Sequence, residues 1–222
     1  METRKCTLAA AALVLILALA VSGCFVVALS PWFGTEAVVT DKGFEGLWKT
    51  DDDEWLEVTP ADVEYGGSTV KGYKLQYRSC GRKDEPALFG VIGQVGKHRY
   101  MSYVSPEDDM DKLQGIPAFM LTRLSIDGDL LMLGHLSRTY VEELWRKRML
   151  GLSFVCSDKN GVRQPSRGEA RLCDDDVVLL TEDRAALQDF LVRNQDDASL
   201  FDKPEKPAVR ITEPPCGKED RK

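Results

Sequence analysis

Residues 118–136 read AFMLTRLSIDGDLLMLGHL, and this stretch decides the fold class. Apolar and polar residues alternate on both sides of Asp127-Gly128, as they do in half-buried strands. Asp-Gly between two such runs is a strong hairpin signal, because both central residues of a type I′ turn have a positive φ. The stretch therefore predicts an antiparallel β-hairpin.

Similar runs recur outward from this hairpin, separated by turns about 8–12 residues apart. The predicted strands toward the N-terminus are 44–49, 55–59, 73–78, 87–95 and 98–104, and a last strand follows at 176–180. We expect a mainly β protein of the α+β class, an antiparallel meander curled into an open barrel or sandwich. Aromatic residues on these strands either line an apolar pocket or form a packed core.

Two helices are predicted in the C-terminal half. The first, at 139–150, has apolar residues at helical spacing. The second begins after Thr181, which we expect to be its N-cap, and its apolar face is formed by Leu187, Phe190 and Leu191.

The N-terminus reads as a targeting segment. Arg4 and Lys5 precede an unbroken apolar run at 8–21, which has the length of a signal-peptide core. Val21-Ser22-Gly23-Cys24 then resembles the lipobox of bacterial lipoproteins. The resemblance implies that the thiol of Cys24 accepts a diacylglyceryl group and that cleavage after Gly23 makes Cys24 the mature N-terminus. The reaction needs cysteine because a thiolate is the nucleophile.

Two alternatives to lipidation stay open, since the residues after Cys24 are still apolar. An uncleaved helix over 7–29 would be about 35 Å long, enough to cross a bilayer core of ~30 Å. Simple secretion is the other. Both membrane-bound interpretations place the body outside the cytoplasm, facing the periplasm. Phe25, where sorting in enteric bacteria would place Asp to retain a lipoprotein, favours the outer membrane over the inner one.

The chain divides into four predicted parts. Residues 1–23 are a lipoprotein signal peptide, and 24–42 are the lipidated N-terminus with a short tether. A β-rich globular domain follows at 43–195. Residues 196–222 are rich in proline and charge, which predicts an irregular tail.

Four cysteines remain in the body: Cys80, Cys156, Cys173 and Cys216. An even number in an exported chain predicts two disulfides, and four cysteines allow three connectivities. We favour Cys156–Cys173, because these residues flank a polar, turn-rich stretch that a bridge would close into a loop. Cys80 would then pair with Cys216. Without a C-x-x-C motif and with two histidines, no zinc site, other metal or cofactor is predicted.

The net charge excludes one class of partner. The whole chain carries −7, and the mature part is one unit more negative because the leader has a net charge of +1. An acidic body has no general attraction to nucleic acid. The predicted partners are the membrane, through the lipid anchor, and either an apolar ligand or an envelope protein.

No catalytic constellation is recognised. His98 and His135 lie outside any nucleophile motif, and the aspartate clusters at 51–53, 108–111 and 174–176 lack the spacing of a calcium loop. Gly90, Gly93 and Gly96 are interpreted as glycines of a curved strand rather than a phosphate loop. We therefore predict a non-enzymatic protein with no catalytic residues. The enzymatic alternative is an unrecognised hydrolase, which carboxylates clustered with a histidine in one cleft would favour.

The order of short motifs over 44–194 resembles an uncharacterised family of bacterial lipoproteins with a lipocalin-like β-rich body. The motifs include Gly46-Leu47-Trp48-Lys49, Ile116-Pro117 and Asp127-Gly128-Asp129-Leu130. The resemblance implies a fold and no established activity. The expected function is a membrane-anchored extracytoplasmic lipoprotein that binds a partner or an apolar ligand. The alternatives are an assembly protein of an envelope complex without a ligand cavity, and a single-span uncleaved membrane protein.

Overall fold

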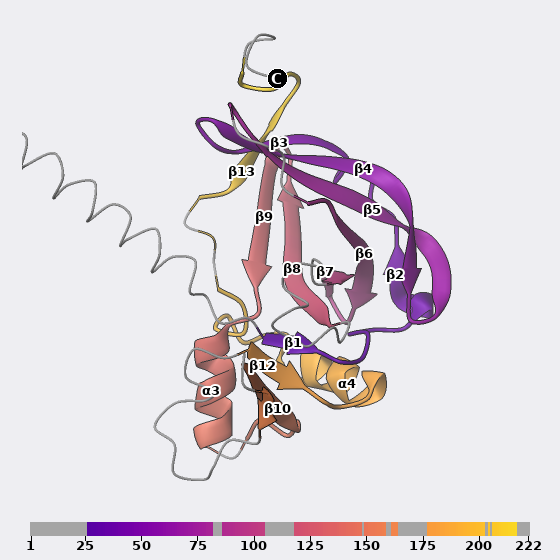
Figure 1. Ribbon diagram of the computed structural model, residues 1–222, viewed down its shortest axis with the longest axis vertical. Coiled ribbons are helices and arrows are strands. Elements are labelled where there is room, and N and C mark those ends of the chain that lie inside the picture. The colour runs from indigo at the N-terminus through magenta and orange to yellow at the C-terminus, as the bar shows by residue number, and fades with distance from the viewer. Residues whose placement is uncertain are drawn as a thin grey trace, which may run out of the picture.

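The computed structural model describes residues 26–81, 86–104, 118–147, 149–158, 161–163, 177–202, 204 and 206–216 (Figure 1). Gly23, Cys24 and Cys173, three of the predicted site residues, lie outside this part of the chain. In the described part, no helix is long and apolar enough to cross a membrane.

Strands dominate the described chain. They are β1 (Val26–Ala28), β2 (Val38–Val39), β3 (Gly46–Asp51), β4 (Glu54–Tyr65), β5 (Ser68–Ser79), β6 (Leu88–Val95), β7 (His98–Val104), β8 (Phe119–Asp127), β9 (Leu130–His135), β10 (Phe154–Asp158), β11 (Gly161–Arg163), β12 (Val177–Leu180) and β13 (Ala208–Ile211). The helical elements are a 3-10 turn, η1 (Thr35–Ala37), and two α-helices, α3 (Arg138–Arg146) and α4 (Arg184–Asn194). The mainly β class and the two helices in the C-terminal half are confirmed.

Eight strands form a closed ring. Each strand from β3 to β9 is antiparallel to the next, and β13 pairs with both β9 and β3. Figure 1 shows this ring, with β9 and β13 on one side and β6 on the other. The curled antiparallel meander is thus confirmed, and β13 closes the barrel that the sequence left open.

The hairpin that decided the fold class forms as predicted. β8 and β9 are in register from Thr122↔His135 to Asp127↔Leu130. Gly128 in the turn has a φ of 58°, a value that glycine adopts without steric cost.

A second layer packs below the ring in the view of Figure 1. β1 is parallel to β12 and antiparallel to β8, and β10 adds to the far side of β12. Ser137 caps α3 by accepting from the amide of Tyr140, and Asp183 rather than Thr181 caps α4.

Two hydrophobic cores result. Residues that pair directly across antiparallel strands share a face. The inner face of the ring carries large buried side chains, among them Trp48, Leu56, Tyr73, Ile92 and Met101. The outer core lies between the ring and the second layer and includes Phe33, Tyr100, Leu187 and Phe190.

Glycines on β6 allow the backbone and side chains to approach closely. A Cβ on Gly93 would lie 2.3 Å from the ring of Phe33, and one on Gly90 would lie 2.9 Å from Ser102 O. Gly96, with a φ of 57°, lies in the β6–β7 turn. Gly90 and Gly93 therefore lie on a strand, as interpreted from the sequence, whereas Gly96 is a turn glycine.

Two predicted boundaries are wrong. Residues 26–42 are not a tether: they form β1, η1 and β2, and Trp32 is fully buried and donates from Nε1 to Phe119 O. The tail after residue 195 is not irregular throughout, because it buries Leu200 and Phe201 and contributes β13. Val26–Ala28, which follow the apolar leader closely, belong to the sheet, and the four residues of β13 are too few to stand out in a proline-rich segment.

Candidate functional site

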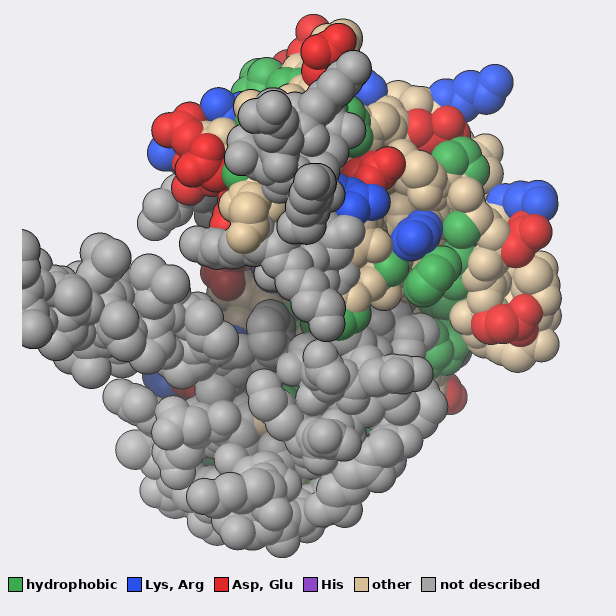
Figure 2. Space-filling model, turned by 45° about the horizontal axis from the view of Figure 1, so that its top comes forward, with side chains coloured by type: hydrophobic (Ala, Val, Ile, Leu, Met, Phe, Trp, Pro, Cys, Tyr) green, Lys and Arg blue, Asp and Glu red, His purple; other side chains and the backbone are tan. Residues whose placement is uncertain are grey.

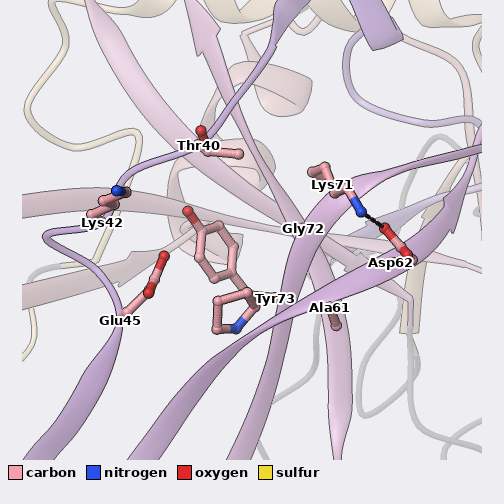
Figure 3. Close-up of a pocket in the computed structure, with 9 residues that line it drawn as sticks. Thr40, Lys42, Glu45, Ala61, Asp62, Lys71, Gly72 and Tyr73 are labelled. Carbon is pink, nitrogen blue, oxygen red and sulfur yellow. Dashed lines mark hydrogen bonds and ion pairs between the residues drawn. The ribbon is translucent and has the colours of Figure 1, made fainter.

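A cleft opens where β5 separates from β6. β5 pairs with β6 only at residues 73–75, and beyond that point β2 takes its place, with Val38 opposite Gly93. The loop after β2 therefore faces the free half of the β4–β5 hairpin across a hollow of about 350 Å³ (Figure 3).

Three segments line the hollow. The loop contributes Thr40, Lys42 and Glu45; β4 and β5 contribute Pro60, Ala61, Asp62, Lys71, Gly72 and Tyr73. Gly72 lies where β5 crosses closest to β6, since a Cβ there would be 2.5 Å from Gly90 O. Because Gly72 has no side chain, β5 and β6 can lie close together beside the cleft.

Tyr73 holds the loop against the strands. Its hydroxyl accepts from Asp41 N at 2.6 Å and lies 3.2 Å from Asp41 O, to which it donates. Its ring meets Phe44 edge to face, with centroids 5.2 Å apart. Burial raises the pKa of Tyr73 above its usual value of 10.0, so the phenol stays protonated and keeps this donor at neutral pH.

The charges around the cleft are mixed. Lys71 and Asp62 are directly opposite on β5 and β4 and form an ion pair at 2.6 Å on one side of the hollow, while Lys42 and Glu45 lie on the other (Figure 3). Asp41 pairs with Arg99 behind the loop. On the described part of the face in Figure 2, acidic and basic side chains likewise lie among one another. The cleft therefore offers both hydrogen-bond donors and acceptors to a polar group.

Arg210, on β13, supports the loop from the end of the ring. Its guanidinium carbon lies 4.1 Å from the ring centroid of Trp48, and Nη1 donates to Glu45 O at 2.8 Å. Nη2 donates to Gly43 O, and Nε lies 3.5 Å from Asp129. Sequence reasoning missed this residue, because its segment was predicted to be irregular and its partners are distant in the chain, with Gly43 and Glu45 more than 160 positions away.

The two histidines lie apart from the cleft lining. Nδ1 of His98 is 2.9 Å from Arg123 Nη2, and burial, followed by the charges of Arg123 and Lys97, lowers the pKa of His98. Nδ1 of His135 is 3.2 Å from Thr122 Oγ1, which also contacts the hydroxyl of Tyr103. Among the described residues no three metal-ligating side chains gather.

Of the aspartate clusters, the one at 51–53 lies at the β3–β4 turn and is exposed. Lys49 donates to Asp52 at 3.0 Å, and this hydrogen bond lowers the pKa of Asp52. The clusters at 108–111 and 174–176 lie outside the described residues.

The structure describes three of the four predicted disulfide cysteines. Cys80 and Cys216 are bonded to each other, with their Cα atoms 5.7 Å apart. The bridge ties the end of β5 to the segment after β13, and it joins the two cysteines that we paired from the sequence. Cys156 is fully buried and disulfide-bonded. Its predicted partner, Cys173, is not among the described residues, so that pairing stays a prediction.

The predicted lipidation site lies immediately before the sheet. Cys24 precedes Val26, the first residue of β1, by two positions, so their Cα atoms are at most about 7 Å apart. β1 lies beside β8 at Met120 and Phe119, and β9 occupies the next positions along the same edge, from Thr122 onward. The chain that enters β1 therefore comes in beside the end of β9.

Comparisons of the chain with protein-family models, with curated proteins and with solved structures found no match. The resemblance to a lipoprotein family with a lipocalin-like body stays an expectation from the sequence. A functional proposal therefore depends on the cleft, the two cores and the position of Cys24.

Proposed function

We propose that this protein is an extracytoplasmic lipoprotein, held in the cell envelope by lipid on Cys24, whose body binds a partner. The observation that carries the proposal is the burial of Val26, Val27 and Ala28 in β1, directly after the lipobox. These residues belong to the folded body, so the fold begins within two residues of Cys24.

The position of β1 directly after the lipobox affects the alternative in which residues 7–29 form an uncleaved transmembrane helix. A helix over 7–29 needs the residues of β1, which instead pair with β8 and β12. Without them the apolar stretch is 7–25, about 28 Å long as a helix, which is at the short end of what crosses a bilayer core. Val26, Val27 and Ala28 belong to the sheet instead. Lipoproteins usually continue with a polar linker after the lipidated cysteine. Here that stretch contains β1, which explains its apolar residues without an uncleaved helix. Cleavage after Gly23 leaves the whole of β1 in the mature chain.

The packing of the ring bears on what the body binds. Trp48, Tyr73 and Met101 are at most 1% exposed, and they fill the inner face together with aliphatic side chains. Small barrels are commonly filled in this way. A filled inner face favours a partner bound outside the ring over an apolar ligand held within it. The mixed donors and acceptors of the cleft make it our candidate for that contact.

A second candidate function is assembly of an envelope complex without a ligand site. The same packed interior favours it, as do the apolar side chains exposed on β9 and β13. For either function we propose a location on the periplasmic side of a membrane, with the outer membrane favoured by Phe25.

The lipid anchor is tested by mass spectrometry of the protein extracted from membranes. We expect a mature chain that begins at Cys24 and carries the mass of a diacylglyceryl group. Cys24→Ala should keep residues 1–23 and gain no lipid. Cys6→Ala is the matched control, because it removes a leader cysteine outside the lipobox and should be processed like the parent.

Two results would contradict the anchor. One is a parent chain from membranes that retains residues 1–23 without lipid, which would restore the single span. The other is a Cys24→Ala variant that is processed and membrane-bound like the parent. The binding role is tested separately, by co-purification of envelope proteins with the parent and with a Lys71→Glu variant of the cleft. Equal recovery of every partner would remove the cleft from the proposal.

A further inference from the structure

Apolar side chains form a short strip on the outer wall of the ring. Of the seven large hydrophobic residues exposed in the described chain, Leu130, Met132 and Val209 lie on the adjacent strands β9 and β13 and are 42–43% exposed. Leu131 between the first two belongs to the inner core, so its neighbours point outward. Val209 is directly opposite Leu130. We call these three residues the β9–β13 strip.

The strip begins near the point where the anchored end of the chain leaves the sheet. Leu136, just after β9, donates from its amide to Leu121 O, and the register of β1 places Val26 at the level of Leu121 on the same edge of β8. Cys24 is two residues before Val26, and Met132 is four residues before Leu136. At the rise of an extended chain, Cys24 and Met132 lie within roughly 25 Å of each other.

On the other side of the point where the chain enters β1, other elements cover the outer wall of the ring. The outer core beyond Leu136 is packed under α3 and α4, whose buried residues include Tyr140, Leu144, Leu187 and Phe190. Gly134 is covered by the segment after α4, since a Cβ there would be 2.8 Å from Asp202 O. The β9–β13 strip is the apolar part of this wall that no described segment covers.

We propose that the β9–β13 strip lies on the surface of the bilayer that holds Cys24. The proposal rests on the proposed lipid anchor and adds an orientation to it. An anchor with only Phe25 between it and a buried strand cannot hold the body away from the membrane, so one side of the ring must face the lipid. Leu29, just after β1, is 36% exposed and nearer to Cys24 along the chain, but it is a single side chain. The strip is a group of three exposed apolar side chains within reach of that anchor, and two acyl chains supply the attachment that three side chains cannot.

The proposed orientation predicts which side of the ring faces water. Phe89 is 45% exposed and belongs to β6, a strand on the far side of the ring from β9 (Figure 1). It matches the strip residues in exposure and type but should face water. Lys49, which is opposite Val209 on β3, pairs with Asp52, and Lys206 also lies near Asp52. Because Asp51 and Asp53 are exposed in the same turn, the neighbourhood of the strip offers no excess of positive charge to anionic lipid. The contact is therefore apolar, and it should persist at high salt.

The test uses the lipidated, full-length mature protein in vesicles of phosphatidylethanolamine and phosphatidylglycerol that contain brominated phosphatidylcholine. Met132→Trp and Phe89→Trp each add one fluorophore to the four native tryptophans. We expect bromine to quench the added fluorescence of Met132→Trp by at least half. The added fluorescence of Phe89→Trp should be unchanged.

A second measurement needs no substitution in the strip. Peroxide oxidation of native Met132, followed by peptide mass spectrometry, should be several-fold slower in the vesicle-bound protein than in an unlipidated Cys24→Ser chain. Met101, which is 1% exposed, should be oxidised slowly in both samples and reports that the fold is intact.

The outcomes separate this inference from the anchor. Lipidated protein that floats with vesicles, with Met132→Trp unquenched and Met132 oxidised as fast as in the unlipidated chain, overturns the orientation and leaves the anchor standing. Protein that carries no lipid and does not float overturns both. Concentration-dependent protection of Met132 in the unlipidated chain, without quenching by bromine, would assign the strip to a second copy of the chain and overturn the membrane contact.

Discussion

Arg210 is the residue that connects the closing strand to the cleft. Its guanidinium stacks on Trp48, which is fully buried in the inner core, and donates to the carbonyls of Gly43 and Glu45. These carbonyls belong to the loop whose other side is held by Tyr73. A planar group with several donors fits such a set of acceptors and an aromatic face, and an ammonium does not.

Replacing Arg210 should therefore loosen both the loop and the end of the ring. We expect Arg210→Ala to lower the free energy of unfolding by about 2 kcal/mol, since it removes charge-assisted hydrogen bonds and a cation–π contact. Urea unfolding followed by tryptophan fluorescence measures the change. Arg210→Lys keeps the charge and should recover less than half of the loss. A stability of Arg210→Ala equal to that of the parent would show that these contacts contribute nothing net.

Residue roles were only partly predictable from the sequence. The turn glycine at 128 follows from local chemistry, because a type I′ turn needs a positive φ. Arg210 and Tyr73 could not be found in this way, since their partners come from distant segments. The pairing of His98 with Arg123 across β7 and β8 is equally non-local. Local patterns thus predict backbone conformation better than the contacts of long polar side chains.

At the scale of elements, β13 completes the ring with only four residues. It has three registered pairs with β3 and two with β9, against twelve between β4 and β5. The Cys80–Cys216 bridge lies a few residues beyond it and spans 136 positions of the chain. The bridge holds the segment after β13 against the end of β5. β13 can therefore stay paired although it has only four residues.

Removing this bridge should release β13 first. In a Cys80→Ser, Cys216→Ser variant we expect the free energy of unfolding to fall by about 2–5 kcal/mol, since a closed loop of this length restricts the unfolded chain. Hydrogen exchange of β13 amides should become faster by at least tenfold, while the β4–β5 hairpin serves as the internal control. Unchanged exchange in β13 would show that its pairing with β3 and β9 suffices without the bridge.

Elements differed in how far the sequence predicted them. Alternation over 118–136 is long enough to predict β8 and β9, and the inner and outer faces follow from it. β1, β2 and β13 have two to four residues each, which is too short for a period to be recognised. β1 joins the ring to the second layer, β13 closes the ring, and β2 takes the place of β5 beside β6. The wrong tether and tail boundaries therefore have a common cause.

At the scale of the whole molecule, β1, where the described chain begins, is part of both cores. Val26 belongs to the outer core and Val27 to the inner one, and β1 is the only described strand between β8 and β12. The second layer of β10, β11 and β12 is connected to the ring through it. The sequence predicts an attachment point at Cys24, but it does not predict that the chain enters the sheet two residues later, because the apolar residues of β1 continue the hydropathy of the predicted leader.

A mature chain that begins at Ser30 therefore tests the architecture. It lacks two buried valines and the hydrogen bonds of β1 to both neighbours, so its melting temperature should fall by roughly 10–20 °C. Hydrogen exchange in β12 should rise well before that in β4. The control is the complete mature chain with Cys24→Ser, which lacks the lipid and keeps β1.

An unchanged melting temperature for the Ser30 chain would mean that β1 is dispensable. Residues 24–29 would then act as a tether, the body would be free to move away from the bilayer, and the β9–β13 strip would need another partner. A large loss supports the opposite view, in which one short strand serves both as a structural member of the fold and as the connection to the anchor. The orientation of the body then follows from its folding, because a rigid strand sets which wall lies next to the lipid.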